Sequence, residues 1–524
     1  MRYCPISLKH HVRLIVALAL PLSLVACASI DFDYPREESF SMTATDTENT
    51  HLAQQIQKVA AGRSAGESGF VPQVDGIDAL ASRLLLARRA EKSIDVQYYL
   101  IKNDLVGRTF VNSLLAAADR GVRVRLLLDD VFTSGYDAGL RALQSHPNFE
   151  IRIFNPFNRG AVGRTLGAIP NFGRVNRRMH NKTFTVDNQI TIIGGRNIAD
   201  EYFGAREDSK FGDLDVIGIG PIVDDVAEMF DLYWNHETAL PVEAFTKELE
   251  NADEGLETLR SRLQATVEAA KESKYAEAVL DRVFEQIEAE SGAIIWAPYS
   301  LVYDSPDKGV RKKAREAGTV LMPLQETISS ALKEVLIVSP YFVPRKGGIE
   351  ALSEIQGRGV DVTVITNSLA ANNQFTVHSG YAPSRKPLLQ SGVKLYEVRP
   401  DAEVKGSEFV DSDGARATLH TKAFIVDRRH VFIGSFNFDP RSANINTEMG
   451  VIIDDDELGT FFSERVSDGL ALQTYAVFLD DNDRVRWRGQ RNGEAVVYDK
   501  EPETSWWQRF KVGFVRILPI RGQL

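Results

Sequence analysis

Apolar and polar residues follow one another along this chain in two periods, and their order predicts an α/β protein. Residues 93–99 and 122–128 have the short apolar clusters of β-strands, whereas residues 107–120 have apolar positions at helical spacing. A strand, a helix and a second strand in this order are typical of parallel strand pairing. The first half of the chain therefore predicts a βαβ unit.

The second half of the chain repeats this pattern. Residues 335–340 and 360–366 are expected strands with an expected helix at 347–358, and residues 393–398 match residues 149–154 in place and pattern. Repetition in the same order indicates an internal duplication. We therefore expect two similar lobes, each a mixed sheet between helices in an α/β/α arrangement, facing one another about a pseudo-twofold axis.

Composition divides the rest of the chain. We place the first lobe at residues 69–236 and the second at 321–478. Residues 237–320 are charged, Ala-rich and helically periodic, so we interpret them as a helical insertion or linker, preferably a solvated hairpin without chemistry. Residues 479–524 form an amphipathic C-terminal tail, in which residues 506–518 mix aromatic, aliphatic and cationic side chains. Such a segment contacts a membrane or, equally, docks as a helix on the core.

The first 26 residues predict a lipoprotein signal peptide. Basic residues come first, and the apolar run that follows, residues 14–26, is too short to cross a bilayer comfortably. Residues 24–27, Leu-Val-Ala-Cys, resemble a bacterial lipobox, which implies cleavage before Cys27 and lipid attachment to its thiol. The alternative is a buried N-terminal helix, which the positive flank disfavours.

A lipid on Cys27 would make the mature protein a cell-envelope lipoprotein, anchored on the periplasmic side of a membrane. Ala28 stands where an Asp would, by resemblance to other lipoproteins, signal retention in the inner membrane, so we expect the outer membrane. Residues 27–68 are polar and lack sustained apolar periodicity. We expect them to form a tether between the lipid and the folded body.

Composition also narrows the class of protein. With 524 residues, 44% hydrophobic and 25% charged, the chain is globular and long enough for two or more cores. Its formal charge of -11 becomes -14 once the three basic residues of the signal are removed. Since affinity for nucleic acid depends on clustered Lys and Arg, we expect no nucleic-acid partner.

Each lobe contains the same candidate for chemistry. His180 and Lys182, like His420 and Lys422, are two residues apart on an expected strand, so each pair lies on one face of its sheet. One such pair is a weak signal, but two copies in a duplicated frame are specific. An aspartate follows each pair at an expected turn, where we interpret it as orienting and structural. The candidate catalytic set is His180, Lys182, Asp187, His420, Lys422 and Asp427.

These phrases, His-x-Lys-x-x-x-x-Asp, resemble the doubled motif of the phospholipase D superfamily, over about residues 69–475. The resemblance implies two phospholipase D-like lobes with one active site at their interface. It further implies transfer of a phosphatidyl group to the glycerol headgroup of phosphatidylglycerol, with phosphatidylglycerol or phosphatidylethanolamine as donor. This finer similarity, to the cardiolipin synthase C type, rests on residues 96–99, 176–179, 367–370, 378–381 and 436–442.

The chemistry of a phosphodiester agrees with this resemblance. Its negative oxygens repel nucleophiles, so Lys182 and Lys422 would neutralise them, without a metal or another cofactor. One imidazole would attack phosphorus to form a phosphohistidine while the other protonates the departing alkoxide. By resemblance His180 is the nucleophile and His420 the general acid, although the sequence leaves that order open.

Other side chains complete the candidate site. Amide and hydroxyl groups can donate hydrogen bonds to phosphate. Guanidinium groups can bind an anion unless they are merely solvated. Carboxylates can hold an imidazole in one tautomer. A histidine can line the acceptor pocket, or it can belong to the core. The candidates are Asn197, Asn437 and Ser435 as donors, Arg178 with Arg177 for the anion, His378 with Tyr381 for the acceptor, and Glu448 and Asp213 for the histidines.

Three other functions remain open. A true phospholipase D would differ only in letting water intercept the phosphohistidine. A nuclease of the superfamily is disfavoured by the acidic charge and the lipobox, and a non-catalytic envelope lipoprotein by the two intact His-Lys pairs. Some enzymes of the cardiolipin synthase C type work with an accessory protein, which this chain alone does not reveal.

Overall fold

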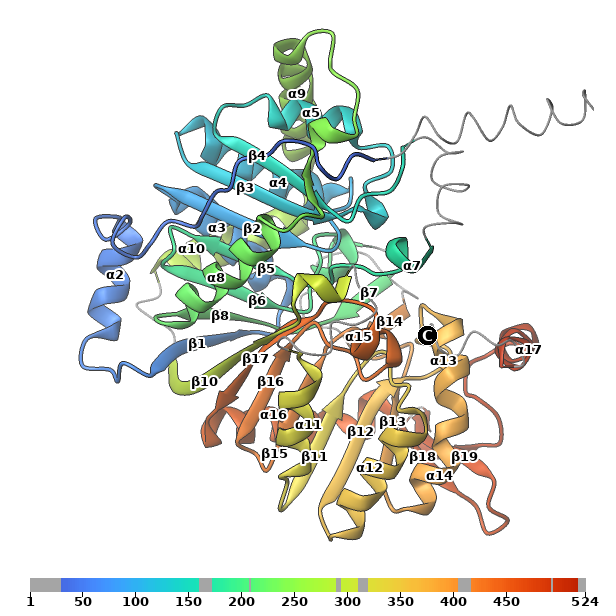
Figure 1. The fold of residues 1–524 in the computed structure, drawn as a ribbon. Helices are drawn as coiled ribbons and strands as arrows, with labels where there is room; N and C mark the ends of the chain where they lie inside the picture. Colours follow the sequence, from blue (N-terminus) through green and yellow to red (C-terminus); the bar gives the residue numbers. More distant parts are fainter. Residues whose placement is uncertain are drawn as a thin grey trace, which may run out of the picture.

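The computed structural model describes residues 30–159, 172–206, 209–288, 294–309, 319–403, 416–491 and 493–516. It consists of two α/β lobes stacked on one another (Figure 1), which confirms the predicted fold class. The expected signal peptide and Cys27 lie outside the described residues, as do residues 289–293 and 310–318 of the expected linker. Within the described ranges, no helix combines the length and the apolar character that a membrane span requires.

The first lobe is a mixed sheet in the strand order β9-β4-β3-β2-β5-β6-β8-β1, in which β2, β3 and β4 are parallel. Helices α3 and α4 cover one face and α8 covers the other. Its elements are β1 (Glu67–Gln73), α3 (Gly76–Arg89), β2 (Ser93–Tyr98), α4 (Leu105–Asp119), β3 (Arg123–Asp129), η1 (Asp130–Phe132), α5 (Asp137–Gln144), β4 (Phe149–Phe154), α7 (Phe172–Val175), β5 (Thr183–Val186), β6 (Ile190–Gly194), η2 (Asp200–Tyr202), β8 (Asp215–Ile219), α8 (Ile222–Trp234) and β9 (Ala239–Pro241).

The second lobe repeats this order as β18-β13-β12-β11-β15-β16-β17-β10, with β11, β12 and β13 parallel. The expected duplication is therefore present in the strand topology. Its elements are β10 (Ile295–Tyr303), η4 (Pro306–Gly309), α11 (Leu321–Ser329), β11 (Glu334–Val338), α12 (Arg345–Gly357), β12 (Asp361–Asn367), α13 (Phe375–Tyr381), η5 (Ala382–Ser384), α14 (Arg385–Gln390), β13 (Lys394–Val398), β15 (Ala423–Val426), β16 (His430–Gly434), α15 (Pro440–Asn444), β17 (Met449–Asp454), α16 (Asp456–Gln473) and β18 (Thr474–Leu479).

Strand β10 joins the two sheets into one. Its first half pairs with β1, with Pro298 opposite Glu67, and its second half pairs with β17, with Tyr299 opposite Ile453. This segment lies within the expected helical linker, residues 237–320, and its strand conformation corrects that expectation. A single apolar core continues across the junction under α8 and α16, and it includes Val216 of the first lobe and Val451 of the second.

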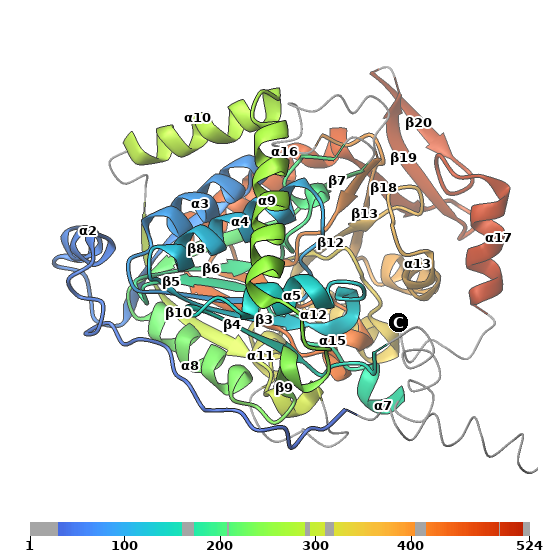
Figure 2. The ribbon, with the colours of Figure 1, turned by 90° about the horizontal axis from the view of Figure 1, so that it is seen from above.

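The remainder of the expected linker is helical and packs on the first lobe. Helix α9 (Ala252–Ala270) lies along α4 and α5, and α10 (Lys274–Glu288) lies along α3 (Figure 2). Leu263 and Tyr275 are buried by these contacts. The two helices therefore cover the lobe rather than forming a solvated hairpin.

The described part of the expected tether is also attached to the first lobe. Residues 30–50 run across it to helix α2 (His51–Ala60). The buried guanidinium of Arg125 is bonded to Asp95 and Asp231, and it also donates to the carbonyl of Ser39 and the hydroxyl of Ser41. The polar composition of this segment therefore did not indicate its specific attachment to the lobe. We call residues 30–50 the strap.

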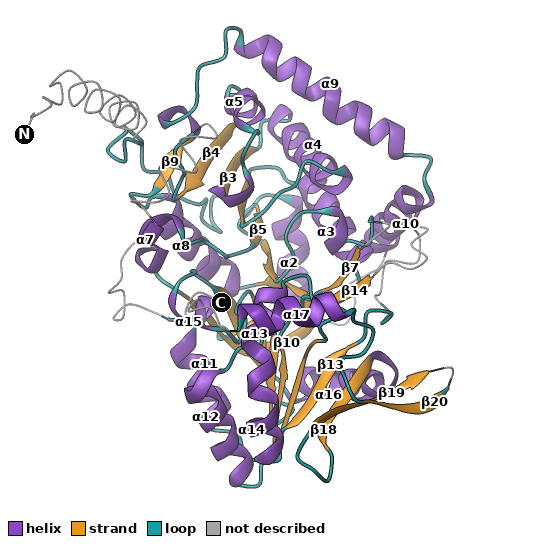
Figure 3. Ribbon diagram, turned by 90° about the vertical axis from the view of Figure 1, so that its right-hand side faces the viewer, coloured by secondary structure: helices purple, strands orange, loops and turns teal. Residues whose placement is uncertain are grey.

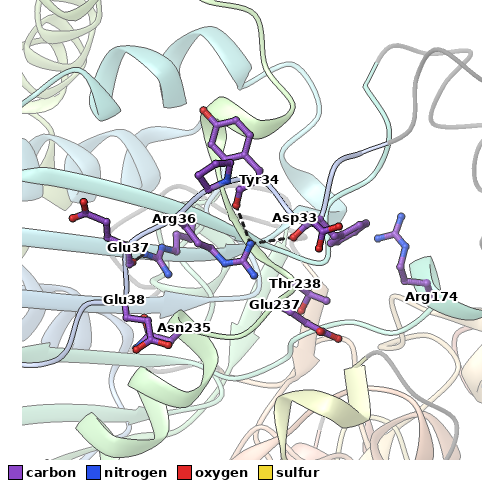
Figure 4. Close-up of a pocket in the computed structure, with 12 residues that line it drawn as sticks. Asp33, Tyr34, Arg36, Glu37, Glu38, Arg174, Asn235, Glu237 and Thr238 are labelled. Carbon is purple, nitrogen blue, oxygen red and sulfur yellow. Dashed lines mark hydrogen bonds between the residues drawn. The ribbon is translucent and has the colours of Figure 1, made fainter.

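A polar hollow of about 610 Å³ separates the first residues of the strap from β4 and α8 (Figure 4). Arg36 points across it and donates to the backbone carbonyls of Phe32 and Tyr34. The ring of Phe32 also lies under the guanidinium of Arg174 in α7. These contacts hold the beginning of the strap beside α7, the helix that precedes His180 in the chain.

The predicted C-terminal tail begins as sheet. Strands β19 (Val485–Arg491) and β20 (Glu494–Tyr498) extend the second lobe beyond β18, and helix α17 (Trp506–Val515) follows. Ser505 and Gln508 form a capping box that starts the helix. Val512 and Val515 are buried, and the helix lies beside α13.

Candidate active site

Backbone hydrogen bonds between the lobes bring the two His-Lys pairs to one interface. The amide of His180 donates to the carbonyl of Thr447, and the amide of His420 donates to that of Gly212, at 2.9 and 2.7 Å. Beside the second contact, β14 (Arg416–Leu419) of the second lobe pairs in parallel with β7 (Ser209–Gly212) of the first. Each histidine therefore lies on a segment that is bonded to the opposite lobe.

The histidines and their candidate carboxylates are paired across the lobes. His180 Nδ1 lies 2.8 Å from Oε2 of Glu448, and His420 Nδ1 lies 2.6 Å from Oδ2 of Asp213. Each carboxylate accepts the Nδ1 proton and leaves Nε2 of its histidine with the lone pair that a nucleophile or base requires. The structure thus brings together all four residues, in a pairing that the sequence left open.

The two carboxylates are held differently. Glu448 is fully buried and accepts hydrogen bonds from the hydroxyls of Ser435 and Ser442, at 2.5 and 2.8 Å. Ser435 therefore supports this carboxylate, whereas we had expected it to bind substrate. In the first lobe Gly195 takes the place of Ser435, and a Cβ there would lie 2.3 Å from Oδ1 of Asp213. A hydroxyl has no room at this position.

Both lysines are buried and contact the histidine of their own motif. Lys182 Nζ donates to the carbonyl of His180 at 2.6 Å, and Lys422 donates to that of His420. Burial lowers the pKa of Lys182 to about 7 and that of Lys422 to about 8. An anion bound between the two ammonium groups would restore their full charge.

Burial also keeps the imidazoles neutral. It lowers the pKa of His180 to about 4 and that of His420 to about 3, and the lysine charges add to both shifts. Although burial alone would raise it, the charge of Lys422 and the hydrogen bond from His420 lower the pKa of Asp213 to about 2. The resting site at neutral pH therefore contains neutral imidazoles beside ionised carboxylates.

The aspartates of the two motifs lie elsewhere. Asp187 is at the opposite end of β5 from His180, where it accepts the backbone amides of residues 91–93. Asp427 accepts those of residues 332–334 in the second lobe. Both carboxylates thus fix the turn before a parallel strand. Asp187 and Asp427 therefore do not belong to the catalytic set. They have the structural role that their position at expected turns indicated.

Two arginine candidates also differ from expectation, and His378 follows the core alternative that the sequence left open. Arg178 is 2% exposed and bound to Asp129 and the carbonyl of Asn155, so it is neither solvated nor free to bind an anion. His378 is a buried core histidine whose Nε2 lies 3.0 Å from Glu501. Arg177 donates to the carbonyls of Lys308 and Asn444 and bridges the lobes.

The two asparagines remain candidates for binding substrate. Asn197 follows β6, Asn437 follows β16, and Asn197 donates to the hydroxyl of Tyr202 at 2.8 Å. The side-chain oxygen of each is buried without a hydrogen-bond partner among the described residues. A hydroxyl group of a substrate would satisfy such an atom.

Aromatic residues that were not among the expected site residues contact both imidazoles. Tyr99 and Tyr202 meet the rings of His180 and His420 edge to face, each at 4.9 Å between centroids, and Phe211 stacks on His420 at 5.5 Å. Tyr99 directly follows β2, where the carboxyl ends of parallel strands meet, so its position was a usable signal. Tyr202 ends the short helix η2 and Phe211 lies in the four-residue strand β7, and neither segment has such a signal.

Comparisons with known proteins agree with this geometry. A family model described as cardiolipin synthase, PLD-like domain, matches residues 85–234 and 324–467. Cardiolipin synthase C of Escherichia coli is 41% identical over 473 residues, which cover 88% of this chain and 97% of that protein. An uncharacterized protein of Helicobacter pylori is 32% identical over 85% of this chain and 88% of its own length.

Solved structures support the fold. The phosphatidylserine synthase of Haemophilus influenzae superposes with a TM-score of 0.53 at 14% identity, covering 80% of this chain and 91% of that one. Together with the doubled motif and the shared site between two duplicated lobes, these matches show that the chain belongs to the phospholipase D-like cardiolipin synthase family.

Proposed function

We propose that this protein is a phosphatidyltransferase of the cardiolipin synthase type, which moves a phosphatidyl group through a phosphohistidine to the glycerol headgroup of phosphatidylglycerol. One observation carries the proposal: two buried His-carboxylate pairs, each shared between the lobes, flank two buried lysines. This arrangement provides one nucleophile, one proton donor and two positive charges for a single phosphodiester.

His180 acts first. Its Nε2 attacks phosphorus, the bond from phosphorus to the headgroup oxygen breaks, and Nε2–H of protonated His420 gives its proton to that oxygen. Binding of the anionic phosphodiester favours the protonated form of His420, because it adds negative charge beside an imidazole whose resting pKa is low. Glu448 stabilises the positive charge that develops on the His180 ring.

The second step reverses the first. His420, now neutral, takes the proton of an acceptor hydroxyl, the acceptor oxygen attacks phosphorus, and the bond from phosphorus to His180 breaks. An alcohol of phosphatidylglycerol yields cardiolipin, and water would yield phosphatidic acid. Lys182 and Lys422 neutralise the phosphate oxygens in both steps.

Mass spectrometry of lipids made by the purified protein tests the proposal. Vesicles would contain phosphatidylglycerol with either isotope-labelled phosphatidylethanolamine or unlabelled phosphatidylcholine. We expect cardiolipin in both, with label incorporated if phosphatidylethanolamine is a donor, and no product from His180→Ala. Phosphatidic acid as the sole product would establish a hydrolase instead.

The placement of the strap supports a lipid anchor on Cys27. Phe32, five positions after Cys27, lies under the guanidinium of Arg174 in α7, the helix that precedes His180 in the chain. Five residues span at most about 17 Å, so a lipid at Cys27 would hold this side of the molecule close to a bilayer. Radiolabelled palmitate on the wild type but not on Cys27→Ser would support the envelope lipoprotein, and label on the variant would refute it. Fractionation of the two membranes would test the expected outer-membrane location.

Helix α17 has the features of a membrane-contacting segment. While Val512 and Val515 pack inward, Trp506, Trp507, Phe510 and Phe514 are each about half exposed or more. Phe172 of α7 and Phe375 of α13 are exposed too, and Figure 3 shows α7, α13 and α17 on the same side of the molecule. Exposed aromatic residues gathered on one side, with cations among them, are typical of contact with lipid headgroups.

Flotation with vesicles tests this contact in the full chain carrying Cys27→Ser. We expect Trp506→Ser, Trp507→Ser and Phe510→Ser together to reduce binding by about tenfold or more. The control is Phe461→Ser with Leu472→Ser, two exposed residues of α16. Equal binding by both variants would exclude α17 as the contact.

A further inference from the structure

An apolar cavity of about 850 Å³ lies under helix α9, apart from the two histidines. Its walls come from β3, α4, α5 and α9, and its volume is in the range of small-molecule sites in proteins. Its apolar lining includes Leu126, Leu128, Leu140, Leu143, Leu259 and Leu263.

Small residues keep this cavity open. Gly135, Ala138 and Gly139 line it from the start of α5, and Ala265 and Ala269 from α9. A Cβ built at Gly139 would meet no atom within 4 Å, although a glycine inside a helix costs about 1 kcal/mol relative to alanine. Neither packing nor helix propensity favours glycine at this position, and the space beside it stays empty.

Two guanidinium groups lie at the rim. Arg108 donates to the side-chain oxygens of Asn103 and Thr266, at 2.7 and 3.1 Å, and both partners are neutral. Arg262 lies one helical turn before Thr266, on the same face of α9. Within the described ranges neither arginine has a carboxylate within ion-pair distance, in contrast to Lys102 on the same rim, which is bonded to Glu201.

The cavity opens toward the edge of the sheet that carries the active site. Helices α4 and α5 begin at the carboxyl ends of β2 and β3, and Tyr99 projects from the same edge onto His180. The rim ion pair of Lys102 with Glu201 adjoins Tyr202, which contacts His420. A lipid in the cavity would therefore lie beside the site without occupying it.

We propose that this cavity binds one acyl chain of an anionic phospholipid, whose phosphate is held by Arg108 and Arg262. An apolar cavity with unpaired cations at its mouth complements a molecule with an apolar tail and an anionic head. The choice of a phospholipid rests on the proposed function, whereas the cavity and its charges do not. The occupant is a lipid retained next to the reaction, distinct from the one that is cleaved.

Photo-crosslinking locates this lipid directly. The full chain carrying Cys27→Ser would be irradiated with phosphatidylglycerol that bears a diazirine in one acyl chain, and peptides would be mapped by mass spectrometry. We expect labels on α5 and α9, and we expect them also in His180→Ala, since no turnover is required. Labels confined to the surface of α17, or to a second copy of the chain, would overturn the proposal.

Variants sharpen the result. Gly139→Leu with Ala269→Leu fills the cavity and should reduce labelling of α5 and α9 about tenfold, whereas Gln264→Leu, an exposed position of α9 outside the cavity, should not. Arg108→Gln with Arg262→Gln should reduce the labelling by diazirine-bearing phosphatidylglycerol to the level obtained with diazirine-bearing phosphatidylcholine. Equal labelling by both lipids in the parent protein would refute the anion site. Cardiolipin formation, measured in parallel, reports on the proposed function separately.

Discussion

The imidazole of His180 is oriented by a carboxylate of the opposite lobe, since its Nδ1 lies 2.8 Å from Oε2 of Glu448, 268 residues further along the chain. The reciprocal pair, His420 with Asp213, crosses the interface in the other direction. Neither lobe contains a complete pair of its own. The duplicated chain therefore makes one active site, and an isolated lobe would make none.

Replacing Glu448 by Gln should impair the nucleophile. The amide would donate a hydrogen bond to Nδ1 and favour the tautomer with hydrogen on Nε2, which cannot attack phosphorus. We expect kcat to fall by about 10²- to 10⁴-fold with little change in KM, measured as cardiolipin formation. Ser442→Ala, which leaves the carboxylate in place, should have a smaller effect. A loss below about tenfold for Glu448→Gln would contradict this role.

The motif aspartates should affect stability rather than chemistry. Asp187→Asn removes a carboxylate that accepts three backbone amides, so we expect the free energy of unfolding in urea to fall by about 1–3 kcal/mol. The kcat of the folded fraction should stay near that of the wild type. Asp361→Asn, which breaks an exposed ion pair with Lys394, serves as the control and should cost less than about 1 kcal/mol. Stable but inactive Asp187→Asn would reassign this residue to catalysis.

The pH dependence of kcat/KM should have an alkaline limb set by the lysines. Burial lowers the pKa of Lys182 to about 7 and that of Lys422 to about 8, and only the protonated forms neutralise a phosphodiester. As pH rises through this range the free enzyme loses positive charge, so kcat/KM should fall. An arginine keeps its charge, so Lys182→Arg with Lys422→Arg should abolish the limb at a lower level of activity. An alkaline limb that persists in this double variant would show that a group other than the two lysines causes it.

Arg178 should matter for folding and not for binding lipid. Burial raises the pKa of Asp129 to about 6 even though Arg178 is its partner, so removal of the cation leaves a buried carboxylate uncompensated. We expect Arg178→Gln to lower the free energy of unfolding by about 3–5 kcal/mol, and Asp129→Asn in addition to restore part of the loss. The KM for phospholipid should remain unchanged. A raised KM in a stable Arg178→Gln protein would return this residue to the substrate site.

Local patterns predicted the repeated part of the fold well. The expected strands at 93–99 and 122–128 correspond to β2 and β3 within one residue, and the expected helix at 347–358 corresponds to α12 within two. These elements have strong periodicity and are bounded by glycine or polar residues. Spacing within the His-Lys motifs likewise identified the reactive groups, because residues two apart on a strand share a face.

Long-range relationships were beyond the reach of local patterns. The sequence showed that Glu448 and Asp213 were candidates, but a separation of more than 200 residues does not reveal which histidine each one contacts. Arg178 was expected to bind an anion because its actual partner, Asp129, lies at the end of a distant strand. Strand β10 was missed because its aromatic and aliphatic residues were included in a longer range that was interpreted as helical from its charged, Ala-rich first part.

The continuous sheet through β10 also limits how the enzyme works. The two lobes share both this sheet and a core. A hinge-like opening between them would therefore break main-chain hydrogen bonds of β10. In the proposed mechanism, donor and acceptor react in turn at His180, between lobes whose relative position this sheet fixes. We therefore expect ping-pong kinetics, in which the headgroup of the donor is released before the acceptor lipid binds.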